Sequence, residues 1–247
     1  MDNLTFYHGT SSLFLDGIHK HGLGYCRSIL DEYKSIELAK DILPLCEELI
    51  EHDGMLMHVD ALKFMVNQTR NFQHGKLFLS TSMAKAMSYA HGNKYGSEIL
   101  SKSLLLLEYL LSIKLSDDVV KYLKGDLYQK YREAYSLLDR RPFPVLLEVN
   151  SVNANELLGL DGTDFTDEIF GLNDFFIDSF KSIIGEQKQT YAHLQDYMVK
   201  NGVIYHNYKA FAIDAKRTSL MPPAFEYQLI EINQDNVISG VTVAGRY

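Results

Sequence analysis

The sequence has no tryptophan, two cysteines and five prolines among its 247 residues. Two cysteines, Cys26 and Cys46, cannot form the disulfide framework of a small secreted domain. The longest apolar stretch, Leu104–Ile113, is interrupted by Glu108 and is too short to cross a bilayer. The first residues show no basic-then-apolar signal pattern. We therefore expect a cytoplasmic protein with no membrane partner.

Positive charge is also scarce. The chain has 24 Lys and Arg against 32 Asp and Glu, a formal net charge of −8. This balance argues against extended non-specific binding to nucleic acid. Hydrophobic residues at 46% and charged residues at 23% are close to the globular average, so an ordinary packed core is expected.

Short apolar segments alternate with long helical stretches, which is typical of an α+β domain. Apolar and aromatic runs predict strands at residues 4–7, 77–81, 143–149, 203–205, 210–213, 227–232 and 237–243. Helical periodicity is found at 12–21, 28–51, 55–66, 83–90, 97–139, 175–184 and 190–199. Pro44 should kink or divide the helix at 28–51. We predict one domain, residues 1–247, with helical insertions at about 28–70 and 97–140.

A histidine ends the first predicted strand. His8 is followed by Gly9 and Thr10. A neutral imidazole can hydrogen-bond a ligand hydroxyl, and a backbone without Cβ can approach a flat amide closely. The His-Gly dipeptide occurs four times in the chain, so by itself it is not specific.

A second segment, residues 75–90, is a short strand that leads into an alanine-rich helix. Phe78 in the strand and Tyr89 in the helix can present two rings to one pocket, where they would enclose a planar heterocycle. The alternative is that both rings belong to the core.

A third segment carries a carboxylate at the start of an apolar strand. Glu226 precedes the run Tyr227–Ile232. A carboxylate in this position can hold a sugar hydroxyl and stabilise positive charge that develops on a ribose ring. The alternative is a solvated residue at the edge of a sheet.

Together the three segments resemble the poly(ADP-ribose)-polymerase-like ADP-ribosyltransferases. The resemblance rests on residues 6–10 with His21-Gly22-Leu23, on residues 75–89 and on residues 225–230, in the family's order. These motifs cover about a fifth of the chain. The resemblance implies a split β-sheet ADP-ribosyltransferase fold, NAD as a substrate and no metal.

The resemblance also implies a role for each matched residue. His8 would bind the adenosine ribose and Gly9 the nicotinamide carboxamide, with Phe78 and Tyr89 stacked on the nicotinamide ring. Glu226 would hold the nicotinamide ribose and favour an oxocarbenium-like transition state, with His8 as the second catalytic residue. Thr10 and Ser80 complete the expected NAD-binding set. The expected reaction is transfer of ADP-ribose to a macromolecular target with release of nicotinamide.

The chain departs from the family at three positions. Phe78 stands where the family has a tyrosine, and Ala86 where many members have a serine. Ala224, two residues before Glu226, replaces the acidic or amide residue of arginine-modifying members. The resemblance is therefore to a divergent enzyme that transfers one ADP-ribose unit, with arginine a disfavoured target.

Other readings of the same residues stay open. One is a catalytically degenerate module that only binds NAD or ADP-ribose. Another is an NAD-dependent RNA 2′-phosphotransferase, which would need further His and Arg residues such as Arg27 and His74. A metal site formed by His19, His21 and His91 lacks a strong ligand spacing. The target is a protein or a nucleic-acid base, and divergence fits a bacterial or phage-related toxin or effector. The helical insertions are expected to recognise the target or an inhibitory partner protein.

Overall fold

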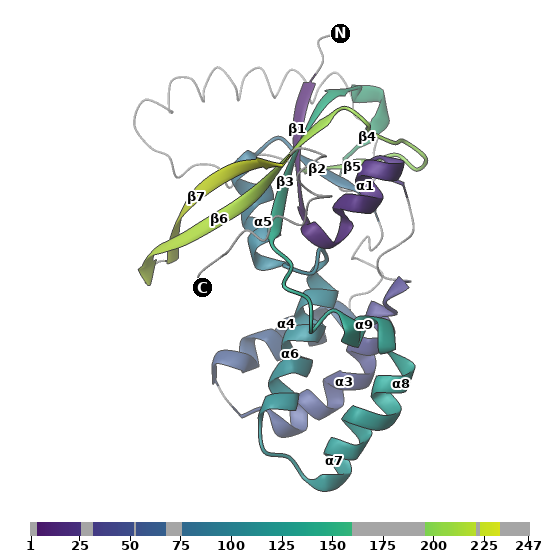
Figure 1. Ribbon diagram of the computed structural model, residues 1–247, viewed down its shortest axis with the longest axis vertical. Coiled ribbons are helices and arrows are strands. Elements are labelled where there is room, and N and C mark those ends of the chain that lie inside the picture. The colour runs from purple at the N-terminus through teal and green to yellow at the C-terminus, as the bar shows by residue number, and fades with distance from the viewer. Residues whose placement is uncertain are drawn as a thin grey trace.

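The computed structural model describes residues 4–25, 32–51, 53–67, 76–159, 196–220 and 223–232. Within these ranges the chain combines helices with a seven-stranded antiparallel sheet, which confirms the α+β class. Figure 1 shows the sheet with α1 and α5 at one end and a lobe of helices at the other. None of the helices in these ranges combines the length and apolarity needed to span a membrane.

The sheet has the strand order β4-β5-β2-β1-β3-β6-β7. Its strands are β1 (Leu4–Ser11), β2 (Phe78–Ser80), β3 (Pro144–Val152), β4 (Leu157–Leu158), β5 (Asp196–Val199), β6 (Tyr208–Leu220) and β7 (Pro223–Ile232). The last two strands are longer than expected and form a ribbon that extends away from the rest of the sheet (Figure 1).

Two helices cover the two faces of the sheet. On one face α1 (Leu15–His21), which follows the 3-10 turn Ser12–Phe14, packs on Phe6, Leu79 and Tyr197. On the other face α5 (Met83–Gly92) packs its Ala86 and Met87 on β3 and β6. Each face therefore has its own apolar core.

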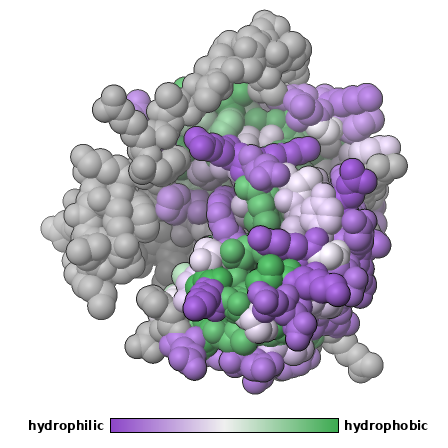
Figure 2. All heavy atoms as spheres, turned by 60° about the horizontal axis from the view of Figure 1, so that its bottom comes forward, coloured by the Kyte–Doolittle hydropathy of each residue, from purple (hydrophilic) through white to green (hydrophobic). Residues whose placement is uncertain are grey.

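The helical lobe has a separate core. It contains α3 (Ser35–Leu49), α4 (Asp53–Asn67), α6 (Glu98–Ser112), α7 (Asp117–Tyr122), a π-helical turn (Leu123–Leu127), α8 (Tyr128–Lys130) and α9 (Arg132–Ser136). The apolar run noted in the sequence is the buried face of α6, since Leu104, Leu106, Leu107 and Leu110 are inaccessible to solvent. Figure 2, viewed toward this lobe, shows apolar surface surrounded by hydrophilic residues.

Three local predictions differ from the structure. Pro44 lies inside α3, which continues on both sides of it although Pro44 itself donates no backbone hydrogen bond. Residues 196–199 form β5 and not the end of a helix. At 203–205 the structure has an isolated bridge between Tyr205 and Leu23 in place of a strand. The predicted elements at 175–184 and 237–243 lie outside the described residues.

The sheet is weakly joined between β1 and β2. In the described part of the chain one pair, Tyr7 with Ser80, registers these two strands, whereas β1 pairs with β3 along its whole length from Leu4 to Ser11. The sheet is thus divided into the group β4-β5-β2 and the group β1-β3-β6-β7. We call the line between Tyr7–Ser11 of β1 and β2 the seam.

Gly9 allows α5 to lie close to the sheet. A Cβ atom at this position would stand 2.1 Å from the Ala86 carbonyl oxygen and 3.0 Å from the Ala90 nitrogen, both of which are backbone atoms. A side chain at position 9 would therefore push α5 away from β1. The close packing of α5 on β1 therefore explains, without a ligand, why residue 9 is a glycine.

We expect Gly9→Ala to lower the free energy of unfolding by about 3 kcal/mol, since the clash is with backbone that cannot rotate away. Gly17→Ala is the control, because Gly17 lies within α1 with no atom near its Cβ position. It should raise the free energy of unfolding by about 0.8 kcal/mol through helix propensity. Urea unfolding of both variants checks the pair, and equal stabilities would contradict the packing role of Gly9.

Candidate functional site

His8 bridges the seam. Its Nδ1 lies 2.8 Å from the Phe78 carbonyl oxygen of β2. Continued antiparallel pairing after Tyr7–Ser80 would bring Phe78 opposite Gly9, but the register ends at that single pair. The imidazole therefore takes the place of a backbone hydrogen bond where the two strands separate.

The hydrogen bond fixes the chemical state of His8. A carbonyl oxygen only accepts, so Nδ1 carries the proton and donates it. Burial lowers the pKa of His8, an effect that the Phe78 carbonyl partly offsets. The neutral ring thus has its proton on Nδ1, which leaves Nε2 with a lone pair for a hydroxyl donor.

One flank of α5 faces the seam. Lys85 Nζ lies 2.6 Å from Asp196 Oδ2, so this flank is turned toward β5. Tyr89 follows Lys85 by four residues and lies one helical turn further along the same flank. Met87, on another side of the helix, packs with Ile213 of β6.

Phe78 and Tyr89 are both accessible from the α5 side of the sheet. Leu79 belongs to the core beneath α1, so Phe78 points to the opposite face, the one that α5 covers. Tyr89 is 42% exposed. Burial of its hydroxyl, with the nearby Glu98 carboxylate, raises the pKa of Tyr89 to about 12, while the Glu98 N–H donates to the oxygen. The phenol is held at the start of α6, and its ring remains open to a ligand.

The sequence pattern did not reveal a carboxylate on β5, one strand from the seam. Asp196 begins β5, pairs with Ser80 of β2 and has a side chain that is 26% exposed. Its sequence signal resembles that of Glu226, an acidic residue before an apolar run, here Tyr197–Val199. Because residues 190–199 were interpreted as a helix, Asp196 was not recognised as the first residue of a strand.

The structure does not bring Glu226 to the seam. Glu226 lies on β7 opposite Lys216 of β6, at the other edge of the sheet from β5. The residues paired in register with His8 across the sheet are Leu147, Ala210 and Ile232, and Ile232 of β7 is six residues from Glu226. At about 3.3 Å per residue, Glu226 is displaced from His8 by about 20 Å along the strand direction. It is also displaced by three strand spacings across the sheet. The four expected groups therefore do not converge on one pocket.

The other expected NAD-binding residues have structural roles. Ser80 is buried, and its Oγ accepts a hydrogen bond from the Ser82 N–H at 3.1 Å in the turn before α5. Ser82 caps this helix by accepting from the Lys85 N–H. Thr10 is buried and paired with Val145 of β3. Gly9 remains at the seam beside α5.

The histidines considered for a metal site are used differently. His19 Nδ1 lies 2.8 Å from the Tyr208 hydroxyl, and His21 stacks on Tyr25 with ring centroids 4.3 Å apart. Within the described ranges no three His, Cys, Asp or Glu residues are grouped as metal ligands. Arg27 and His74 lie outside these ranges.

Comparison with protein-family models, with curated proteins and with solved structures gave no match.

Stability should depend on the protonation of His8. Unfolded histidine takes up a proton near pH 6.5, whereas folded His8 does so at lower pH. The unfolded state then binds more protons, so the free energy of unfolding falls as pH drops below about 6.5. Burial also lowers the pKa of His58 and His91, so the wild type must be compared with His8→Gln.

The variant should lose part of this pH dependence in urea unfolding between pH 5 and 8. An NMR titration in which the His8 ring protonates at or above its ordinary pKa would contradict the assignment.

Proposed function

We propose that the protein transfers ADP-ribose from NAD to a macromolecular target and releases nicotinamide, and that the reaction takes place at the seam. The observation that carries this proposal is the position of Asp196. Its carboxylate lies on β5, the strand paired with β2, which carries Phe78 and accepts the hydrogen bond from His8. The resemblance requires a strand that opens with a catalytic carboxylate, and β5 meets this description one strand from the seam, where β7 does not.

Phe78 and Tyr89 provide the nicotinamide site. Both rings belong to the α5 side of the seam, one from β2 and one from α5. A cationic pyridinium gains from aromatic faces on either side. The registered pairing of β1 with β2 ends before Gly9, where a carboxamide can bond backbone groups that this pairing does not use.

Asp196 provides the charge that the reaction needs. The bond from the ribose C1″ to the pyridinium nitrogen breaks, its electron pair goes to that nitrogen, and nicotinamide leaves as a neutral molecule. Positive charge then develops on the ribose, where a carboxylate held at the 2″-hydroxyl stabilises it. The acceptor forms the new bond to C1″ and loses a proton to water. Lys85, at 2.6 Å, orients the Asp196 carboxylate.

His8 provides a hydroxyl acceptor. With Nδ1 bound to the Phe78 carbonyl, Nε2 is left to accept from a ribose hydroxyl of NAD. His8 is paired with Leu147 of the α1-side core, so this hydroxyl lies across the seam from Phe78 and Tyr89. The division of the sheet into β4-β5-β2 and β1-β3-β6-β7 supports the split-sheet ADP-ribosyltransferase architecture. Exposed Met57 and Phe64 on α4 make the helical lobe our proposed recognition surface for the target.

A module that binds NAD without turnover is the second candidate. It is favoured by one observation, the close ion pair that already occupies Asp196. The two candidates differ in whether nicotinamide is released.

We expect Asp196→Asn to lower kcat for nicotinamide release by about 100-fold, because the developing charge loses its counter-charge. The Kd for NAD should change little, since the amide still accepts a hydrogen bond from the hydroxyl. Glu226→Gln is the matched control and should retain the wild-type rate. Nicotinamide is quantified by chromatography and NAD binding by calorimetry. Loss of turnover in Glu226→Gln with retention in Asp196→Asn would reverse the assignment, and no turnover in the wild type would favour the binding module.

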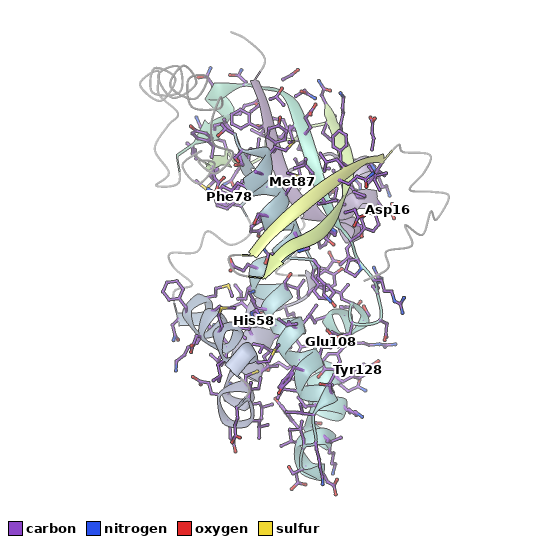
Figure 3. The ribbon with its side chains drawn as sticks, turned by 90° about the vertical axis from the view of Figure 1, so that its left-hand side faces the viewer. Asp16, His58, Phe78, Met87, Glu108 and Tyr128 are labelled. Carbon is purple, nitrogen blue, oxygen red and sulfur yellow. The ribbon has the colours of Figure 1, made fainter. Side chains whose placement is uncertain are left out.

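We expect Phe78→Ala to weaken NAD binding about tenfold through loss of one stacked ring. Tyr128→Ala is the control, because Tyr128 is an exposed aromatic of α8 in the helical lobe. Figure 3 labels both residues and shows Phe78 in the half that contains the sheet and Tyr128 in the helical lobe. Calorimetric titration with NAD compares the two variants, and an equal effect of both would contradict a ring site at Phe78.

A further inference from the structure

Helix α4 presents two large apolar side chains to solvent. Met57 is 68% exposed and Leu56 is 38% exposed, although Val59 and Leu62 of the same helix lie in the buried core of the lobe. An exposed methionine is typical of surfaces that bind apolar side chains, because its flexible thioether adapts to the shape of what it contacts. These two residues therefore mark a contact surface on the lobe.

Carboxylates border these apolar side chains on the side of α3. Lys63 Nζ lies 2.6 Å from Glu47 Oε1, so the flank of α4 that carries Lys63 faces the end of α3. Asp60 and Leu56 precede Lys63 by three and seven residues and lie on the same flank. Residues 47–60 contain five acidic residues and no lysine or arginine. We use the name α4 surface for the residues Glu48, Glu51, Leu56, Met57 and Asp60.

The end of α3 lacks the positive charge that a helix favours there. Its last turn contains Glu47 and Glu48 and no basic residue. The carboxyl end of a helix carries partial negative charge, so cations stabilise this position and carboxylates do not. The hydrogen bond and charge of Glu47, with a smaller effect of Asp60, raise the pKa of Lys63. One lysine thus faces a local excess of negative charge, and among the described residues neither Glu48 nor Glu51 forms an ion pair.

The sign of the charge selects among the occupants of this surface. The phosphate groups of nucleic acid or of an anionic lipid would be repelled by the carboxylates. A second copy of the chain would bring the same carboxylates to a two-fold interface, where like charges oppose each other. A helix with one apolar side and flanking basic residues matches both the exposed apolar side chains and the charge.

We propose that the α4 surface binds a basic amphipathic helix of a partner protein. The apolar side of that helix covers Leu56 and Met57, and its lysine or arginine side chains reach Glu48, Glu51 and the carboxyl end of α3. The use of this surface to select the target of ADP-ribose transfer rests on the proposed function, whereas the binding itself does not require NAD.

Binding is tested without NAD, with a fluorescein-labelled helical peptide of leucine and lysine, about four turns long, as the probe. Two matched peptides have glutamate in place of lysine, or alanine in place of leucine. Fluorescence anisotropy should show that the wild type binds the leucine–lysine peptide about tenfold more tightly than either matched peptide. Equal affinity for the leucine–lysine and alanine–lysine peptides would reduce the interaction to general charge attraction and overturn the inference.

Met57→Ala should weaken binding of the leucine–lysine peptide about tenfold, because one buried apolar contact is lost. Met83→Ala is the matched control, because Met83 is 40% exposed at the start of α5. Both substitutions place alanine in a helix, which favours the fold. An equal loss of affinity in the two variants, or no loss in Met57→Ala, would overturn the inference.

Glu48→Gln combined with Glu51→Gln should weaken binding about fivefold at low salt and make it less dependent on salt. Asp16→Asn combined with Glu231→Gln is the control, since it removes two exposed charges from α1 and β7. Figure 3 shows Asp16 in the half that contains the sheet. Equal effects of the two pairs would assign the attraction to the net charge of −8 and overturn the inference.

Two further measurements separate this inference from its alternatives. A dimer of the wild type in sedimentation that Met57→Ala abolishes would overturn it in favour of a second copy of the chain. Peptide binding with no release of nicotinamide from NAD would contradict the proposed function and leave the α4 surface in place. Release of nicotinamide with no peptide binding would overturn the α4 surface and leave the proposed function in place.

Discussion

The two halves of the sheet meet, in the described part of the chain, at one registered pair and one side-chain hydrogen bond. The bond from His8 to the Phe78 carbonyl spans the place where the pairing of β1 and β2 ends, and it defines the tautomer of the imidazole, while burial lowers the pKa of the ring. A fully paired sheet would have its backbone groups satisfied at this point and no space between the strands. This interaction spans the break in the pairing and leaves Nε2 of His8 as the acceptor nitrogen beside it.

Helix α5 covers the face of the sheet to which Phe78 points. The missing Cβ of Gly9 lets the helix lie against β1, and the cap at Ser82 sets where the helix begins. Lys85 in its first turn reaches Asp196 of β5, and Tyr89 follows one turn later on the same flank. Residues from β1, β2, α5 and β5 are thereby combined by packing that none of these segments determines alone.

Sequence reasoning reached the parts of the site that have local signals. The strand at Phe78, the helix at 83–90 and His8 at the end of a strand follow from short-range patterns. Strand β5 did not, because its four residues are too few to show a period and the preceding residues read as helix. Glu226 and Asp196 carry the same local signal, and only strand order distinguishes them. The residue pattern within a segment does not determine which distant segment it pairs with. The sequence could therefore not show which of the two carboxylates, Glu226 or Asp196, lies near β2.

A crystal structure of the protein with a non-hydrolysable NAD analogue tests the central claim most directly. The account predicts the nicotinamide ring between Phe78 and Tyr89, a ribose hydroxyl on His8 Nε2 and the nicotinamide ribose beside Asp196. An analogue bound along β7 beside Glu226, or in the helical lobe, would contradict it.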